Sequence, residues 1–175
     1  MRKPAFKKIL IGRNEWCQIP GLNLPAIKAK IDTGAKTSSI HAFNIVPISK
    51  GKQKWVNFDI RPIQRNENLT IACSALVVDK RLIMSSNGHR ERRYIIMTSL
   101  KIADQCWDIE LSLSNRDPLR FRMLLGREAL NGHVLIDPSL SCYQGAFKKK
   151  YRASLSSAHR RPLPSKAASG IQFCT

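Results

Sequence analysis

Apolar residues recur at every second position in short runs along this chain, a spacing typical of half-buried β-strands. In the run 106–113, for example, Trp107, Ile109 and Leu111 alternate with polar residues. The run 54–60 alternates in the same way through Val56 and Phe58. The pattern predicts strands over 8–12, 26–32, 54–60, 69–78, 93–102, 106–113 and 120–125.

Turn-forming residues separate these runs. They occur at Pro20-Gly21, at 49–51, at 66–68 and at Asn87-Gly88. Asn87-Gly88 predicts a tight β-hairpin, because both residues tolerate the positive φ of a type I′ turn. One short helix is predicted over 127–131, ended by Gly132. Many short strands with one short helix predict an all-β barrel or sandwich.

Composition predicts one folded domain. The chain has 175 residues, of which 43% are hydrophobic, enough for a single core. We expect a folded domain over 1–147 and a basic, disordered tail over 148–175, because no acidic residue follows Asp137 and Ser, Ala, Pro and Lys dominate the end. No apolar run approaches the roughly 18 residues that would span a bilayer. We therefore expect a cytoplasmic protein with no membrane partner.

The charge of the chain is strongly positive. Lys and Arg number 30 against 12 Asp and Glu, a formal net charge of +18. Such a charge attracts nucleic-acid phosphates or acidic peptides, and charge by itself does not choose between them. The basic tail predicts either a contact with the ribosome, RNA or anionic lipid, or simply a solvated terminus.

The sharpest motif is an apolar strand that runs directly into Asp32-Thr33-Gly34-Ala35. Gly34 allows a tight turn and a close approach of another chain, and the Thr33 hydroxyl can hold that turn. The same three residues also commonly form an Asx turn with no further function. A second motif, Met123–Leu125 followed by Gly126-Arg127 and the predicted helix, makes the pair more specific.

Together these motifs resemble the retropepsin-like aspartic peptidases. They are most similar to a bacterial family known as ATP-dependent zinc proteases or RimB-like proteins. The similarity runs from about Ile9 to Tyr143 and is carried by four stretches: 27–43, 85–88, 113–117 and 121–130.

The resemblance implies a retropepsin-like closed barrel and an aspartic endopeptidase. Asp32, with Thr33 and Gly34, would be catalytic. Since such a site needs two carboxylates that share a proton, and the chain has one Asp-Thr-Gly, the resemblance implies a homodimer with one Asp32 from each subunit.

The resemblance also implies a substrate-binding region. Ala35 would contact substrate, and the hairpin with Asn87 and Gly88 would be a flap, although a plain surface hairpin explains it equally well. Arg92 and Arg93 would bind carboxylates of an acidic or glutamate-rich peptide, or of a polyglutamylated protein. Gly126 and Arg127 would support the site from behind.

Two departures from the family pattern matter. Lys36 stands where retropepsins often have an acidic residue, so Arg127 needs another partner, either Asp117 or Glu128. Neither zinc nor ATP is supported, because the histidines lack metal-ligand spacing and no P-loop occurs. The histidines are His41, His89, His133 and His159. We expect no cofactor and no metal.

Two other functions stay open. One is a catalytically inactive basic module that binds the ribosome or RNA, although aromatic residues are few, at 7%. The other is a metal-dependent hydrolase, as the name of the family suggests.

Overall fold

The computed structural model describes residues 7–63, 69–84, 88–114 and 121–145. Within these ranges the chain is mostly β-strand, with one 3-10 helix, η1 (Pro20–Leu22), and one short α-helix, α1 (Arg127–Leu130). The strands are β1 (Ile9–Ile11), β2 (Asn14–Ile19), β3 (Leu24–Asp32), β4 (Ser38–His41), β5 (Phe43–Lys50), β6 (Gln53–Ile60), β7 (Ile71–Met84), β8 (Arg90–Ile102), β9 (Gln105–Ser114), β10 (Met123–Gly126) and β11 (Val134–Ile136). The predicted all-β class with a short helix after Gly126-Arg127 is confirmed. Neither helix of the described ranges is long and apolar enough to cross a membrane.

The described strands form a large sheet and a small one. The large sheet has the order β2-β3-β10-β4-β9-β8-β7-β6-β5, and β1 pairs in parallel with β11 in the small sheet. The large sheet curls until β2 meets β8, but only Gln18 and Lys101 pair at that seam. Strands β7, β6 and β5 continue beyond it. The expected closed barrel is therefore corrected to a curled sheet that does not close fully.

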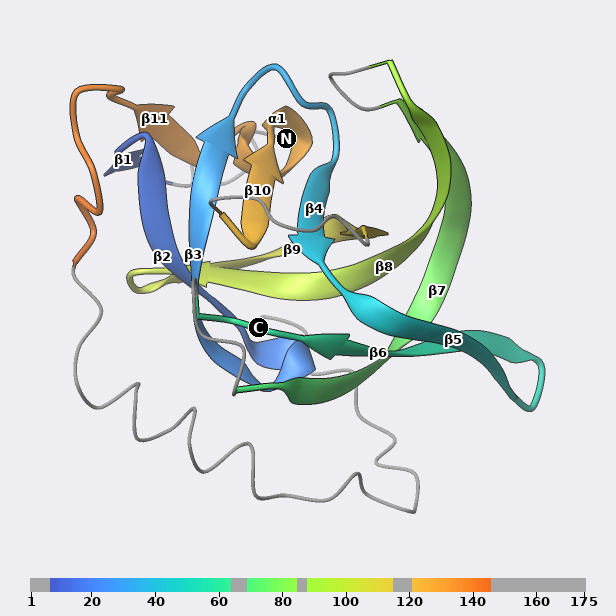
Figure 1. Cartoon of the computed structure of the whole chain (residues 1–175). Helices are drawn as coiled ribbons and strands as arrows, with labels where there is room; N and C mark the ends of the chain where they lie inside the picture. The colour runs from blue at the N-terminus through green and yellow to red at the C-terminus, as the bar shows by residue number, and fades with distance from the viewer. Residues whose placement is uncertain (1–6, 64–68, 85–87, 115–120, 146–175) are drawn as a thin grey trace, which may run out of the picture.

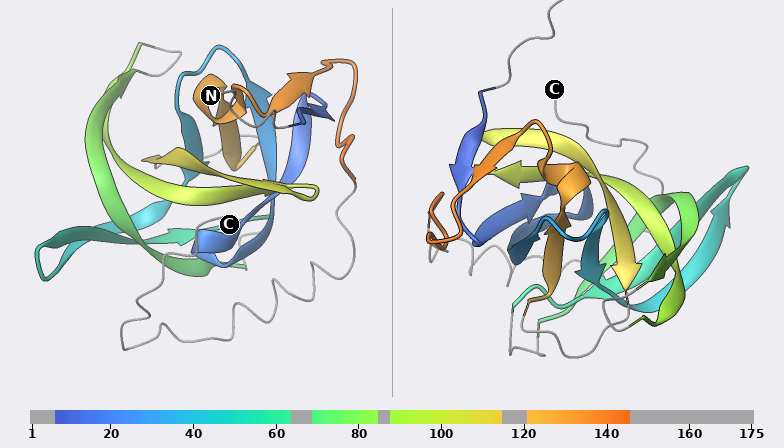
Figure 2. Two further views of the ribbon diagram at one scale, coloured as in Figure 1. Left: turned by 180° about the vertical axis from the view of Figure 1, so that it is seen from behind. Right: turned by 90° about the horizontal axis from the view of Figure 1, so that it is seen from above.

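Two hairpins extend away from this curled sheet (Figures 1 and 2). The hairpin of β5 and β6 projects to one side, and the long ribbon of β7 and β8 curves upward in Figure 1. The upper end of that ribbon lies on the same side of the molecule as the loop 33–37 and the small sheet of β1 and β11. This side gathers most of the residues that the sequence marked as functional.

Every predicted strand overlaps an observed one, and the strands that sequence reasoning missed have a physical explanation. Strand β2 buries two polar residues, Asn14 and Glu15, which breaks the apolar alternation. Strand β4 is short and begins with two serines. Strand β5 contains Pro47, which a strand tolerates at the edge of a sheet, where β5 lies. Strand β11 has only three residues.

The hydrophobic core lies inside the curl. Side chains from β3, β4, β8, β9 and β10 meet there and are fully buried, among them Ile27, Ile40, Ile96, Leu111 and Leu125. Burial of such side chains stabilises the fold by roughly 1.5–3 kcal/mol each. The core thus holds β3 and β10 rigidly, and both strands end at the loop 33–37.

A buried carboxylate joins the two ends of the described chain. Glu15 is 0% exposed, and its oxygens accept hydrogen bonds from the backbone N–H of Gly12 at 2.8 Å, Tyr143 at 2.8 Å and Gln144 at 3.2 Å. The backbone of Cys142 also donates to Asn14 O at 2.8 Å. Segment 141–145 is therefore held against the start of β2 by polar contacts, which explains why β2 lacks the apolar pattern.

Glu15→Ala is expected to destabilise the protein strongly. The buried N–H of Gly12 and the part-buried N–H groups of Tyr143 and Gln144 would lose their acceptor. Because an unsatisfied buried donor costs about 1–3 kcal/mol, the free energy of unfolding should fall by about 3 kcal/mol. Glu15→Gln keeps one acceptor oxygen and should lose less. Urea unfolding of both variants measures the difference. A loss below about 1 kcal/mol for Glu15→Ala would show that water replaces the carboxylate.

Candidate functional site

The candidate site is the loop that follows β3. Strand β3 runs parallel to β10 in a register that pairs Asp32 with Gly126, so both strands end at the same edge of the sheet. Asp32 is half-buried and Thr33 is exposed. The core-facing strands therefore place this carboxylate at the surface at a fixed position.

Asp32 forms an Asx turn. Its Oδ1 accepts hydrogen bonds from the backbone N–H of Gly34 at 3.0 Å and of Ala35 at 3.3 Å. A Cβ on Gly34 would lie 3.2 Å from that oxygen, which is a tight contact. The Asp-Thr-Gly-Ala motif thus has a structural role in this chain, because the Asp32 side chain shapes the loop that carries it.

Helix α1 holds the loop from the other side. The backbone N–H of Arg127 donates to Ala35 O at 2.8 Å, and that of Glu128 donates to Lys36 O at 3.2 Å. These are donors of a helix N-terminus, which have no partner inside the helix. The motif of β3 and the motif of β10 are therefore joined directly.

The side chain of Arg127 also contacts the loop. Its Nη1 donates to Gly34 O, a backbone carbonyl, at 3.2 Å. Glu128 lies 3.6 Å from the ammonium of Lys36. Asp117 lies outside the described residues. Lys36, which departs from the retropepsin pattern, is thus matched by an acidic residue on the helix.

Gly126 and two serines complete the support. A Cβ on Gly126 would lie 2.8 Å from Lys36 O and 2.9 Å from Ala35 O, so a side chain does not fit. The N–H of Gly126 donates to Ser38 Oγ at 3.1 Å, and Ser112 Oγ donates to Ser38 O at 2.9 Å. Sequence reasoning missed both serines, since a buried serine gives no signal in an apolar pattern.

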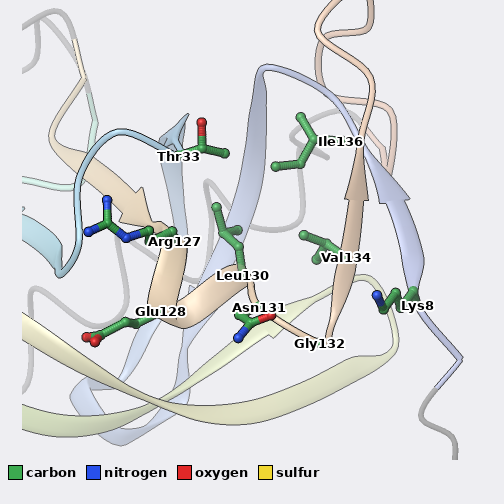
Figure 3. Close-up of a pocket in the computed structure, with 9 residues that line it drawn as sticks. All are labelled: Lys8, Thr33, Arg127, Glu128, Leu130, Asn131, Gly132, Val134 and Ile136. Atoms are coloured by element: carbon green, nitrogen blue, oxygen red, sulfur yellow. The ribbon is translucent and has the colours of Figure 1, made fainter.

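A pocket of about 450 Å³ lies between this loop, α1 and the small sheet (Figure 3). Leu130, Val134 and Ile136 form its apolar part, and Figure 3 shows their side chains gathered around one space. Lys8, Thr33, Arg127, Glu128, Asn131 and Gly132 line the rest. The side chain of Glu128 points away from the apolar residues. Sequence reasoning did not find this pocket. Lys8 lies far from α1 and β11 in the sequence, and β11 follows no motif.

An aromatic side chain, that of Trp107, contacts helix α1. Trp107 Nε1 donates to Ala129 O at 2.8 Å, and the Trp107 ring stacks on His133 with centroids 4.6 Å apart. Burial lowers the pKa of His133, which favours its neutral form. In the described part of the chain, no group of three or more His, Cys, Asp or Glu side chains could hold a metal ion.

The remaining residues predicted for substrate binding lie on or near β8. Gly88 is exposed with φ +76°, and Asn87 lies outside the described residues. Arg92 is exposed, but Arg93 is only 6% exposed, and its Nε donates to Glu91 Oε2 at 2.9 Å. Arg93 is thus paired with Glu91, and its role in binding a substrate carboxylate stays a prediction. Arg92 and Arg93 differ in exposure because neighbouring residues of a strand point to opposite faces.

The family assignment follows from a family model described as "RimB-like: Retropepsin-like aspartic endopeptidase RimB". It matches residues 10–146 and so includes both motifs. The chain belongs to the RimB-like family. A Legionella pneumophila protein of unknown function has a similar solved structure, with a TM-score of 0.65 at 25% identity, covering 79% of this chain and 100% of that one. The retropepsin-like part of the predicted family is thus shown, and nothing in these matches supports the zinc or ATP in its other name.

Curated relatives of this RimB-like chain carry a different activity in their names. A "Probable alpha-L-glutamate ligase" of Desulfotalea psychrophila is 48% identical over 86% of this chain, and that match covers 32% of the relative. Proteins of the same name from Shewanella pealeana and Parasynechococcus marenigrum are 48% and 45% identical, over 77% and 82% of this chain. These matches cover 29% and 31% of the two relatives. The chain therefore spans about a third of the length of the curated relatives that it matches.

These relatives overturn the predicted aspartic peptidase. Their printed names describe a ligase, which forms a bond, whereas the sequence motifs predicted a hydrolase that cleaves peptides. The expected hydrolase activity is overturned with that prediction. The Asx turn of Asp32 gives the Asp-Thr-Gly motif a role in loop structure that requires no catalysis.

Asp32→Ala is expected to loosen the loop 33–37. Two backbone donors lose their acceptor at a partly exposed site, so we expect a loss of about 0.5–1.5 kcal/mol in the free energy of unfolding. Asp32→Asn keeps an oxygen acceptor and should lose less than half as much. Urea unfolding and amide hydrogen exchange of Gly34 and Ala35 measure both effects. Equal losses in the two variants would show that the charge matters rather than the acceptor.

Gly126→Ala should destabilise the same site by steric conflict. Its Cβ would meet backbone atoms of the loop at 2.8–2.9 Å, and such overpacking costs about 1–3 kcal/mol. Gly51→Ala is the matched control, since its Cβ would meet nothing within 4 Å and only its φ of +62° is strained. Thermal unfolding should rank Gly126→Ala below Gly51→Ala. The reverse order would contradict the tight contact between Gly126 and the loop 33–37.

Proposed function

We propose that this chain is a domain that binds an acidic, glutamate-bearing polypeptide during α-L-glutamate ligation. The observation that supports the proposal is the 48% identity over 86% of the chain to a stretch that makes up 32% of a probable alpha-L-glutamate ligase. A domain of this size within a longer ligase suits a polypeptide-binding role. We assign the ligation chemistry to the remaining length of such proteins.

The charge of the chain suits such a polypeptide. Each glutamate joined through its α-amino group adds a carboxylate, so the product becomes more acidic as it grows. The formal net charge of +18 draws such a chain in and holds it, in a way that weakens as salt increases. This argument needs no catalytic role for Asp32.

The ion pairs among the described residues leave much of the positive charge available to a partner. Among the described residues, Asp79 and Glu110 pair with Arg81, Glu91 pairs with Arg93, and Glu128 pairs with Lys36. Other cations are exposed: Lys30, Lys52, Lys54, Lys80, Arg90 and Arg92. Because several carboxylates are already occupied, the exposed cations dominate the field that an incoming polypeptide meets.

We add to this proposal the two other partners predicted from the sequence, a second copy of the chain and the ribosome. A homodimer would present two cationic surfaces to one polypeptide, and light scattering of the full chain tests it. A contact with the ribosome through the basic residues of 148–175 would bring the domain to an acceptor protein. Those residues lie outside the described ranges, and so does the domain boundary predicted at 147.

Binding of glutamate-tailed peptides tests the proposed function. The peptides share one body and carry zero, one, two, four or six C-terminal glutamates. Since an exposed ion pair contributes about 0.2–1 kcal/mol, the Kd should fall by up to about fivefold with each of the first glutamates added. Fluorescence anisotropy with the full chain at fixed ionic strength measures this series.

Two controls decide between partners. Peptides with glutamine in place of glutamate should bind weakly at every length. A single-stranded RNA with the charge of the six-glutamate peptide should bind no more tightly than that peptide. Equal binding of the glutamine and glutamate series would refute the proposal, and clear preference for the RNA would favour the nucleic-acid module instead.

A further inference from the structure

A row of polar side chains lies where β10 begins. Strand β4 pairs His41 with Ser114 of β9. On its other side, β4 pairs Ile40 with Met123 of β10, so Arg122 comes next to His41. The His41 N–H donates a hydrogen bond to Arg122 O at 2.7 Å, which agrees with this register. Arg122, His41 and Ser114 therefore lie side by side on neighbouring chain segments, and we call them the polar row.

The polar row faces away from the hydrophobic core and is buried nonetheless. The core contains the residues that adjoin the row along the chain: Ile40, Leu113 and Met123. Since neighbouring residues of a strand point to opposite faces, the row points away from these side chains. Arg122 and His41 are each only 7% exposed, and Ser114 is 1% exposed. A guanidinium and a hydroxyl are thus withdrawn from water outside the core.

Two atoms of the polar row have no hydrogen-bond partner among the described residues. They are Nη1 of Arg122 and Oγ of Ser114. The ion pairs within the described ranges do not include Arg122 either, because their acids bind Lys36, Arg81 and Arg93. A buried charge without a counter-ion is strongly unfavourable, and water can satisfy a donor without neutralising the charge. The row therefore calls for an anion.

A second guanidinium adjoins the polar row. That of Arg61 lies 4.5 Å from the centroid of the Phe43 ring, which in turn stacks with His41 at 6.1 Å. Nε of Arg61 is also buried without a hydrogen-bond partner in the described part of the chain. The acid nearest to Arg61 in the sequence, Asp59, accepts a hydrogen bond from Asn44 at 2.8 Å. A second positive charge thus lies near His41.

The polar row is separate from the loop 33–37. Strand β10 spans the four residues Met123–Gly126, and its last residue meets the loop. Arg122 and Gly126 therefore lie about 13 Å apart along the strand. In Figure 1 the row belongs to the lower end of β4 and β10, and the loop lies above. A ligand of the row would bind beside these strands rather than at Asp32.

We propose that the polar row binds a small tetrahedral oxyanion, inorganic phosphate. Arg122 donates from its guanidinium, Ser114 donates from its hydroxyl, and Arg61 adds a second positive charge. Two guanidiniums match a phosphate group, which carries a charge of about −1.5 to −2 at neutral pH. Donors on separate strands approach from different directions, which suits a tetrahedral ion better than a planar carboxylate. The bound ion ties β9 to β10 across β4, a role that goes beyond the proposed function.

Thermal unfolding of the full chain tests the binding of phosphate. The Tm should rise by several degrees as phosphate comes to exceed its Kd, because a ligand that binds only the folded state stabilises it. Sodium chloride at equal ionic strength should give no such rise, and sodium acetate a smaller one. The absence of a rise with phosphate would overturn the proposal. A larger rise with acetate would also overturn it and would assign the row to carboxylates.

Arg122→Met separates binding from general salt effects, which matter because excluded phosphate also stabilises folded proteins. Methionine keeps the apolar stem and removes the unpaired charge, so the variant should unfold without phosphate at no lower Tm than the wild type. Most of the rise with phosphate should be lost. The control Lys7→Gln removes an exposed charge and should keep the full rise. A wild-type rise in Arg122→Met, or an equal loss of Tm in every buffer, would overturn the proposal.

Ser114→Ala tests the site without changing its charge. Since a hydrogen bond to a charged group contributes about 1.5–3 kcal/mol, or at least about tenfold in affinity, calorimetric titration with inorganic phosphate should show a Kd at least about tenfold higher than that of the wild type. The Tm without phosphate should stay close to the wild-type value, because this hydroxyl has no hydrogen-bond partner within the described ranges. Circular dichroism verifies that each variant folds. An unchanged Kd would overturn the proposed site.

Discussion

The structure depends on the pairing of β10 with β3 on one side and with β4 on the other. Strand β10 runs parallel to β3 and antiparallel to β4, and it ends at Gly126, where the chain passes against the backbone of the loop 33–37. Helix α1 begins there, and its first N–H groups bind the carbonyls of Ala35 and Lys36. Two strands far apart in sequence meet at this point, and each motif supports the other through backbone contacts. The loop, the helix and the pocket beside them therefore form as one unit.

This dependence explains what the sequence could predict. Strands with apolar alternation, such as β6 and β9, follow from their own residues, and so does α1 between Gly126 and Gly132. The loop after β3 was recognised because backbone geometry restricts which residues it can contain. Gly126 is restricted in a similar way, because a side chain does not fit at its position. Patterns set by backbone limits remain readable in a single sequence.

The parts that could not be predicted depend on polar contacts between distant residues. Strand β2 buries Glu15, whose partners are backbone groups of Tyr143 and Gln144, more than a hundred positions later. Ser38 and Ser112 act through hydrogen bonds across β4 and β9. Among the described residues, Arg127 binds the carbonyl of Gly34, a group that every residue carries, so no residue type could indicate this contact. In each case the sequence shows a polar residue, and only the fold supplies its partner.

The activity posed a different problem, because one loop shape serves more than one chemistry. An Asx turn after a buried strand keeps Asp32, Thr33 and Gly34 in place whether or not the carboxylate reacts. The curated relatives, which are named as ligases, show that these motifs by themselves do not identify hydrolysis. Charge distribution discriminates better at this point. The ribbon of β7 and β8, which pairs its acids with arginines on one face and leaves cations beside exposed aliphatic residues on the other, constrains the partner directly. Because the cations and the exposed aliphatic residues lie side by side, such a face restricts the chemistry of a partner more than the shape of the loop 33–37 does.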